Sequence, residues 1–222
     1  MTSPGHPHDD LNLRHLLARA TAVEQRVRRA VEARQRTDPD PEDAFRGLYL
    51  ADENIARLLN EEGARGFPDL VGQEGAERVP GASDLVARVD GPAAVPSRLT
   101  ALETDFGLTS LDTEILLIAL VPDLDDRFEA FYGYLNDDVT RRRPSIGLAL
   151  GLCGVSPADA AARGRLAAAA PLRDAGLLLA EDLDRPFLSR ALRVPDRVTA
   201  HLLGDDTRDP RLTDVTAPWE AV

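Results

Sequence analysis

The densest group of side chains that could take part in recognition chemistry lies at residues 137–143. Asp137 and Asp138 are followed by Arg141, Arg142 and Arg143. Guanidinium groups pair with carboxylates through two parallel hydrogen bonds, so this spacing is typical of a surface that recognises a protein partner. It also fits a capped turn in which Asp138 accepts backbone N–H groups and the arginines pair with nearby acids. A phosphate or nucleotide held by the three arginines is a third interpretation. The nearby acids are Asp125, Asp126 and Glu129.

Adjacent carboxylates elsewhere in the chain do not indicate catalysis. A glycosidase or metal site needs two acids held at a fixed separation across a cleft, whereas neighbouring acids usually face water. We therefore assign no catalytic residue and predict that this chain is not an enzyme. The pairs are Asp9-Asp10, Glu61-Glu62, Asp125-Asp126 and Asp205-Asp206.

Histidines and the single cysteine give no metal or nucleophilic site. His6 and His8 lie in a polar terminal stretch that offers no third fixed ligand. We expect His15 and His201 to lie on the surface of helices. Cys153 sits in an apolar run and is expected to be a buried, inert thiol. The prediction is no metal and no cofactor in this chain.

The basic residues are all arginine: the sequence has 26 of them and no lysine. A phosphate-binding P-loop requires a lysine, so the chain cannot carry a complete one. Lysine Schiff-base chemistry is excluded for the same reason. The preference for arginine, together with abundant alanine, aspartate and proline, is typical of a GC-rich, actinobacterial-like genome.

The net charge of −12 argues against nucleic acid as a general partner. Neutralising phosphates requires a basic face, which 38 acids against 26 bases do not favour. There is no run of 18 apolar residues that would span a membrane and no apolar signal sequence at the start. We expect a cytoplasmic protein.

Helical periodicity begins after a polar tail over residues 1–10, which we expect to be disordered. Residues 11–36 repeat apolar side chains every seven positions, which predicts an amphipathic helix. That helix either packs on its own domain or forms an intermolecular coiled coil, so an oligomer through this first helix stays open. A second helix is predicted after the capping signals at Asp40-Pro41, and residues 11–63 together predict a helical hairpin. The apolar side chains that repeat within residues 11–36 form two rows: Leu13, Ala20 and Val27, and Leu16, Val23 and Ala30.

The remainder is predicted to be a linker followed by two helical units. Residues 64–96 are rich in glycine and proline and predict the linker. Residues 97–143 predict a helical subdomain whose centre is the apolar run Ile115–Val121, entered through a capping box at Thr109 and Asp112. Asp123 is predicted to cap the helix that follows this run.

Residues 144–204 have the order of elements of a winged helix. Helices are predicted over Pro144–Cys153 and Pro157–Ala170, with Ser156 as the cap of the second and Pro171–Ala175 as its broken continuation. A hairpin is predicted from strands at Leu177–Ala180 and Phe187–Val194, then a last helix to Leu203 and a polar tail over residues 205–222. The predicted fold class is mainly α: a helical hairpin, a linker, and a helical bundle leading into a winged-helix domain with a two-stranded β-hairpin.

One segment resembles a known family. The run Tyr132–Pro144, with Asn-Asp-Asp-Val-Thr-Arg-Arg-Arg-Pro within it, resembles a signature of bacterial AAA-family ATPases of the type associated with phage-tail-like contractile injection systems. Residues 40–50, Phe106–Leu108, Arg197 and Leu202–Gly204 are also similar to that family. The resemblance covers most of residues 40–212 and implies a helical region and a winged helix ahead of an ATPase module.

The chain departs from that family because no Gly-x-x-x-x-Gly-Lys occurs in it. ATP and Mg²⁺ are expected only for the absent module. The resemblance therefore implies a non-catalytic recognition region whose partner is a protein or its own ATPase module, with oligomers arising through that module. Met1 and the residues after it favour a native start and therefore a sequence that was cut before the ATPase module. A natural stand-alone protein is the alternative.

A second functional hypothesis is a winged-helix transcription regulator with residues 11–36 as its dimerisation helix. Its recognition helix would carry Arg163, Arg165 and Arg173. Residues 97–222 nevertheless contain 14 arginines against 21 acids, which favours a protein partner. A purely structural component of an injection-system particle is a third hypothesis.

Overall fold

The computed structural model describes residues 7–37, 55, 57–58 and 96–207. Most of the second arm of the predicted hairpin, all but the last residue of the 64–96 linker, and most of the 205–222 tail lie outside the described residues. Ile55 is fully buried, and Leu58 packs on the core.

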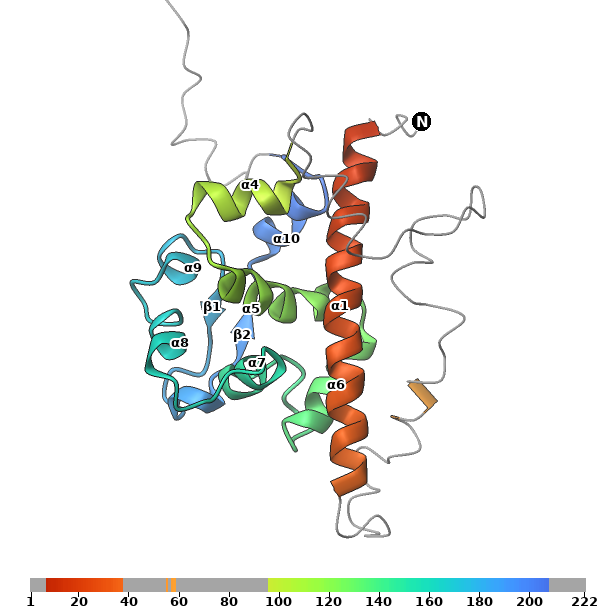
Figure 1. Cartoon of the computed structure of the whole chain (residues 1–222), viewed down its shortest axis with the longest axis vertical. Helices are drawn as coiled ribbons and strands as arrows, with labels where there is room; N and C mark the ends of the chain where they lie inside the picture. The colour runs from red at the N-terminus through yellow and green to blue at the C-terminus, as the bar shows by residue number, and fades with distance from the viewer. Residues whose placement is uncertain (1–6, 38–54, 56, 59–95, 208–222) are drawn as a thin grey trace, which may run out of the picture.

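The first helix, α1, runs over Pro7–Thr37 and stands along one side of the other described elements (Figure 1). It begins inside the stretch 1–10 that we expected to be disordered, so this expectation is wrong for residues 7–10. Its apolar rows are turned inward: Leu16, Ala20, Val23 and Val27 are almost completely buried. The predicted amphipathic helix is confirmed, and its seam packs on this chain's own core.

Two capped helices follow. In α4 (Arg98–Asp105), the Ser97 hydroxyl accepts the Thr100 N–H. In α5 (Ser110–Leu120), Thr109 and Asp112 form the predicted capping box in both directions. Every residue from Ile115 to Val121 is fully buried, so α5 is the central helix of the core, as its all-round apolar sequence predicts.

The next helix, α6 (Arg127–Leu135), follows the 3-10 turn η3 (Val121–Asp123). The prediction that Asp123 caps this helix is wrong. Asp123 lies in the preceding turn and pairs with Arg143, whereas Asp125 accepts the Arg127 N–H at 2.9 Å. Three acids within four positions, Asp123, Asp125 and Asp126, made the choice of cap ambiguous in the sequence.

The winged-helix elements begin at Ser145, which caps α7 (Ile146–Leu152) and forms an isolated bridge to Ala191. Strands β1 (Leu179–Ala180) and β2 (Leu192–Arg193) pair antiparallel, with Leu179 opposite Arg193. Both are shorter than predicted. Phe187–Ser189 forms the 3-10 turn η4 instead of extended strand, directly after Pro186.

The helix predicted over Pro157–Ala170 is wrong in extent. It is replaced by α8 (Ala160–Gly164), while the predicted break at Pro171 is confirmed, because a separate helix, α9 (Pro171–Asp174), begins there. Asp159 is itself the cap, because its carboxylate accepts the N–H groups of Ala161 and Ala162. The last helix, α10 (Asp196–Leu202), ends as predicted just before Gly204, where φ is +104°.

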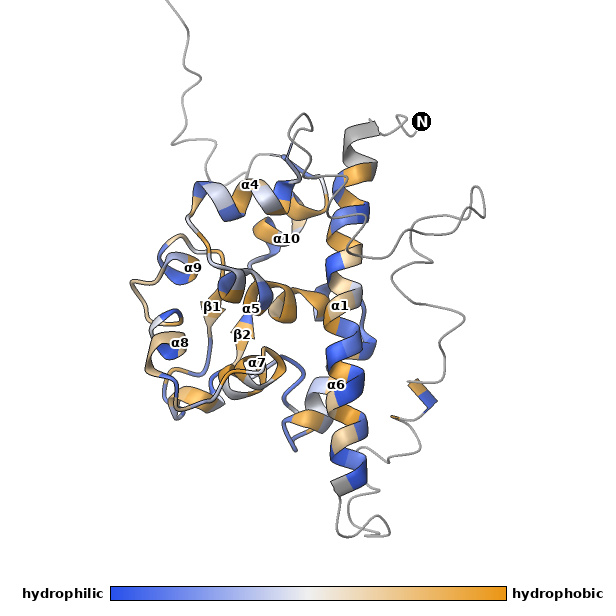
Figure 2. Ribbon diagram, in the orientation of Figure 1, coloured by the Kyte–Doolittle hydropathy of each residue, from blue (hydrophilic) through white to orange (hydrophobic). Residues whose placement is uncertain are grey.

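One hydrophobic core joins these elements. It includes residues of α1, α5, α6, α7, β2 and α10, and it runs without interruption across the boundary predicted between residues 143 and 144. Figure 2 shows hydrophilic and apolar positions along α1 and α5, and a mainly apolar α7. Since α1 contacts α4, α5, α6, α7 and α10, it completes the winged-helix core. No described helix combines the length and the apolar character needed to cross a membrane.

Candidate interaction surfaces

The predicted charge cluster forms the loop between α6 and α7. Asp137 adopts a left-handed conformation with φ of +57°, and its carboxylate accepts from Arg34 of α1 at 2.5 Å. The Asn136 side-chain amide donates to the carbonyls of Arg141 and Arg143 at 3.4 and 3.1 Å. These contacts fold the loop back on itself and attach it to α1.

The three arginines are each paired with an acid. Arg141 pairs with Asp138, and Arg142 with Glu129, each at 3.2 Å. Arg143 makes two bonds to Asp123, at 2.8 and 3.0 Å. Of the pairs expected for a capped turn, Arg142–Glu129 is present, while Asp125 and Asp126 pair with none of the three.

Within this cluster the side chains of Asp137 and Arg142 are the most exposed, at 75% and 70%. Asp138 accepts from the Thr140 hydroxyl at 2.6 Å, and this bond is the main reason that the pKa of Asp138 is lowered. The loop is thus a fixed surface of alternating charge, which suits complementary charges on a protein.

The arginines predicted for a DNA-recognition helix make internal contacts. Arg165 of the turn after α8 donates to both carboxylate oxygens of Asp112, at 3.0 and 3.1 Å from its Nε. Arg163 donates to the Pro157 carbonyl and Arg173 to the Leu166 carbonyl. Since α8 has five residues, the segment also lacks the length of a helix that lies along a DNA groove.

Asp112 is a fully buried carboxylate that joins the central helix to this segment. Burial raises its pKa, but hydrogen bonds from Arg165 and from the Thr109 backbone and hydroxyl outweigh that effect, and the pKa is lowered. The capping-box prediction identified Asp112 correctly. The ion pair with Arg165, 53 residues away, had no local signal in the sequence.

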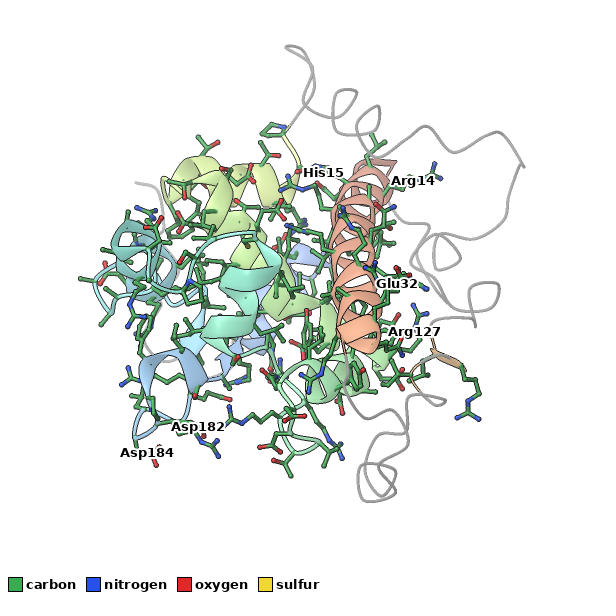
Figure 3. All side chains as sticks on the ribbon, turned by 60° about the horizontal axis from the view of Figure 1, so that its bottom comes forward. Arg14, His15, Glu32, Arg127, Asp182 and Asp184 are labelled. Carbon is green, nitrogen blue, oxygen red and sulfur yellow. The ribbon has the colours of Figure 1, made fainter. Side chains whose placement is uncertain are left out.

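A second buried charge cluster joins α1 to α6, and sequence reasoning missed it. Arg127 donates to Asp125 at 2.6 Å and to Glu24 of α1 at 3.3 Å, while Arg28 also donates to Glu24 at 2.9 Å. The pKa of Arg127 is raised, chiefly by its hydrogen bond to Asp125. Figure 3 shows Arg127 beside α1. The expectation that Asp125 faces water is wrong, because its side chain is 8% exposed.

The two described histidines that we placed on the surface differ. His15 is buried, with Nδ1 2.6 Å from the Ser97 hydroxyl, so its predicted surface position is wrong. His201 is about one-third exposed and lies 2.8 Å from Asp206. Cys153 caps the end of α7 and is half-buried, less deeply than predicted.

An aromatic ring in contact with two arginines was also missed. The guanidinium carbons of Arg163 and Arg190 lie 4.5 and 5.8 Å from the ring centroid of Phe187. The contact joins α8 to the hairpin loop, which Figure 1 shows meeting on the side of the molecule opposite α1. The sequence contains the three residues but gives no distance between segments that are 24 positions apart.

These elements follow one another in the order of a winged helix: the bridge at Ser145, α7, α8 and α9, β1, the hairpin loop and β2. The model for the family described as winged helix domain, variant, matches residues 6–216. The chain belongs to that family. This winged-helix protein includes α1 within the matched range, in keeping with the common core. The comparisons with curated proteins and with solved structures found no match.

The two candidate groups of interaction residues lie at separate places on this winged-helix protein. The 137–143 loop lies beside the lower end of α1, and the Arg163–Phe187–Arg190 group lies at the hairpin. Asp182 and Asp184 mark the tip of the hairpin, away from α1, in Figure 3.

Proposed function

We propose that this chain is a non-catalytic recognition region of an AAA-type ATPase of the kind associated with contractile injection systems. It works in the cytoplasm, and it presents a protein partner to an ATPase module that supplies ATP and Mg²⁺ chemistry. The proposal rests on the resemblance of residues 132–144 to that ATPase family, together with the winged-helix fold. In this role the chain itself neither binds nor hydrolyses ATP.

The observation that carries the protein-binding role is the internal use of Arg165. An arginine that reads DNA bases must direct its donors outward into the groove. Arg165 directs them to the buried carboxylate of Asp112, and removing it would leave that charge unpaired. Arg165, one of the three arginines predicted for a recognition helix, is therefore used for an internal contact.

The charge balance supports the same conclusion. Residues 97–222 carry a net charge of −7, from 14 arginines and 21 acids, and a net negative charge disfavours a polyanion as the general partner. The surface offered to a protein is the 137–143 loop, with Asp137, Asp138, Arg141, Arg142 and Arg143. Both signs of charge are present there, which favours a complementary protein surface over a polyanion.

The second candidate is a winged-helix transcription regulator, which the helix-and-hairpin arrangement favours. It would need α1 as its dimerisation helix. The rows that would form that seam are largely buried against α5, α6 and α7, so dimerisation would require another face of α1.

Two measurements test the proposal. At about 0.15 M salt, the purified chain should show no anisotropy change with duplex DNA and no ATP turnover. Tight binding to DNA, decreasing steeply with salt, would establish the regulator instead.

The ATPase assignment is tested by mixing the chain with the AAA module encoded in the same operon or reading frame. Binding should weaken in Arg142→Glu but not in the exposed α1 variant Arg29→Glu, and absence of such a module would refute the assignment.

A further inference from the structure

The ring of Phe187 contacts two positively charged side chains on the side of the molecule opposite α1. Its centroid lies 4.5 Å from the Arg163 guanidinium carbon and 5.8 Å from that of Arg190. Guanidinium groups stack on aromatic faces while their N–H groups stay available at the edges. The three side chains are half-buried, so solvent screens these charges less than it would screen fully exposed ones.

Neither arginine has a carboxylate partner within the described part of the chain. Arg163 donates from Nη1 to the Pro157 carbonyl at 3.0 Å, and Arg190 from Nε to the Arg185 carbonyl at 3.1 Å. Each guanidinium has five N–H donors, so most of them remain for a ligand. The acid nearest to Arg163 along the chain, Asp159, accepts from the N–H groups of Ala161 and Ala162 instead.

The hairpin loop that carries two of these residues is held in place by α7. A Cβ added at Gly147 would lie 3.2 Å from the Leu188 carbonyl oxygen, so α7 and η4 are in close contact. Around η4, the backbone N–H of Ser189 donates to the Pro186 carbonyl at 2.8 Å, and the backbone N–H of Arg190 donates to the Phe187 carbonyl at 3.3 Å. The positions of Phe187 and Arg190 are therefore set before any ligand binds, which lowers the entropic cost of binding.

We propose that Arg163, Phe187 and Arg190 form a carboxylate-binding site for an acidic segment of a protein partner. This inference deepens the proposed function and rests on it. The two guanidinium groups provide the charge-assisted donors that an aspartate or glutamate requires. Leu183, 58% exposed on the same hairpin, offers apolar contact to the neighbouring residues of such a segment.

An acidic peptide suits this site better than a nucleic acid. Duplex DNA brings a phosphate every few ångströms, and its neighbours would meet Asp182 and Asp184 at the hairpin tip. A peptide can bring one or two carboxylates to the arginine pair and leave uncharged residues opposite those acids. The partner segment is therefore expected to alternate acidic with apolar side chains.

The test uses the full chain and a fluorescein-labelled peptide in which glutamate pairs alternate with leucine. A peptide with glutamine in place of glutamate, and a labelled duplex DNA, serve as comparison probes. We expect binding of the glutamate peptide only, weakened roughly tenfold in Arg163→Gln and in Arg190→Gln. The matched control Arg29→Gln removes an equally unpaired arginine from the exposed face of α1 and should leave binding unchanged.

Phe187→Leu keeps an apolar side chain and should also weaken binding, because the guanidinium groups lose the ring that positions them. Amide spectra of each variant would show that the fold is retained. Failure of the glutamate peptide to bind, or equal binding by Arg163→Gln and Arg29→Gln, overturns the site and leaves the proposed function standing. Tighter binding of the DNA, lost in the same variants, overturns both.

Discussion

At the scale of single residues, the contact between Asp112 and Arg165 is the one whose loss we expect to be costly. Asp112 is fully buried, while the Arg165 side chain remains 30% exposed. Arg165→Met should destabilise the protein by about 3 kcal/mol, because it leaves a buried carboxylate without its cation. The control Arg142→Met breaks a pair whose arginine is 70% exposed and should cost less than about 0.5 kcal/mol. Urea denaturation measures both, and equal midpoints would contradict the assigned importance of this pair.

The same carboxylate predicts a pH dependence. Because the pKa of Asp112 is lower in the folded than in the unfolded chain, its stabilisation is fully present above the ordinary pKa near 4. This stabilisation is lost as the pH falls from the unfolded-state pKa through the folded-state pKa, because over that range the unfolded chain binds a proton that the folded chain does not. The stability difference between the wild type and Asp112→Asn should therefore shrink between about pH 5 and pH 2. A difference that stays constant over that range would refute the assignment.

The thiol of Cys153 should react slowly. Burial raises its pKa to about 11, and the thiolate is the reactive form. At pH 8 the thiolate fraction is then about 100-fold or more below that of a free cysteine with a pKa near 8.5. Iodoacetamide labelling of the native chain should be slower by that factor than labelling in urea, and should accelerate as the pH rises towards 11. Comparable native and denatured rates would show that the thiol is open to solvent.

At the scale of elements, two glycines of α7 provide a matched pair. A methyl group at Gly147 would press against the Leu188 carbonyl at 3.2 Å, whereas nothing lies within 4 Å of one at Gly151. Gly151→Ala should stabilise the helix by up to about 1 kcal/mol, and Gly147→Ala should destabilise the protein by about 1 to 2 kcal/mol. Thermal unfolding of the two variants checks the signs. Stabilisation by both would mean that η4 moves freely away from α7.

The elements that the sequence predicted well are those with local signals. The capping box at Thr109 and Asp112, the all-round apolar run of α5 and the glycine after α10 depend on neighbours in the chain. The α8 segment was predicted too long because alanines favour helix wherever they occur, whereas the helix begins after its cap Asp159 and ends at Gly164. The contacts Arg127–Glu24 and Arg163–Phe187 span long stretches of chain, so no local pattern contained them.

At the scale of the whole molecule, the first helix is a part of the winged-helix core. Its buried residues pack on α5, α6, α7 and α10, which are distant in sequence. The heptad pattern could not distinguish this packing from a coiled coil, because both bury the same rows of side chains. The net acidity, evident from composition, fits a molecule whose arginines are largely used in internal pairs.

A common core predicts that α1 and the winged-helix elements unfold together. Val27 is fully buried on α1, so Val27→Ala should lower the global free energy of unfolding by about 2 kcal/mol. Native-state hydrogen exchange should show the same loss of protection for amides of α5 as for amides of α1, because both exchange through one cooperative opening. Arg29→Ala, on the exposed face of the same helix, should change neither by more than about 0.5 kcal/mol. If only α1 lost protection in Val27→Ala, the helix would be a separate unit, and its apolar row would then be available to a second copy or to a partner.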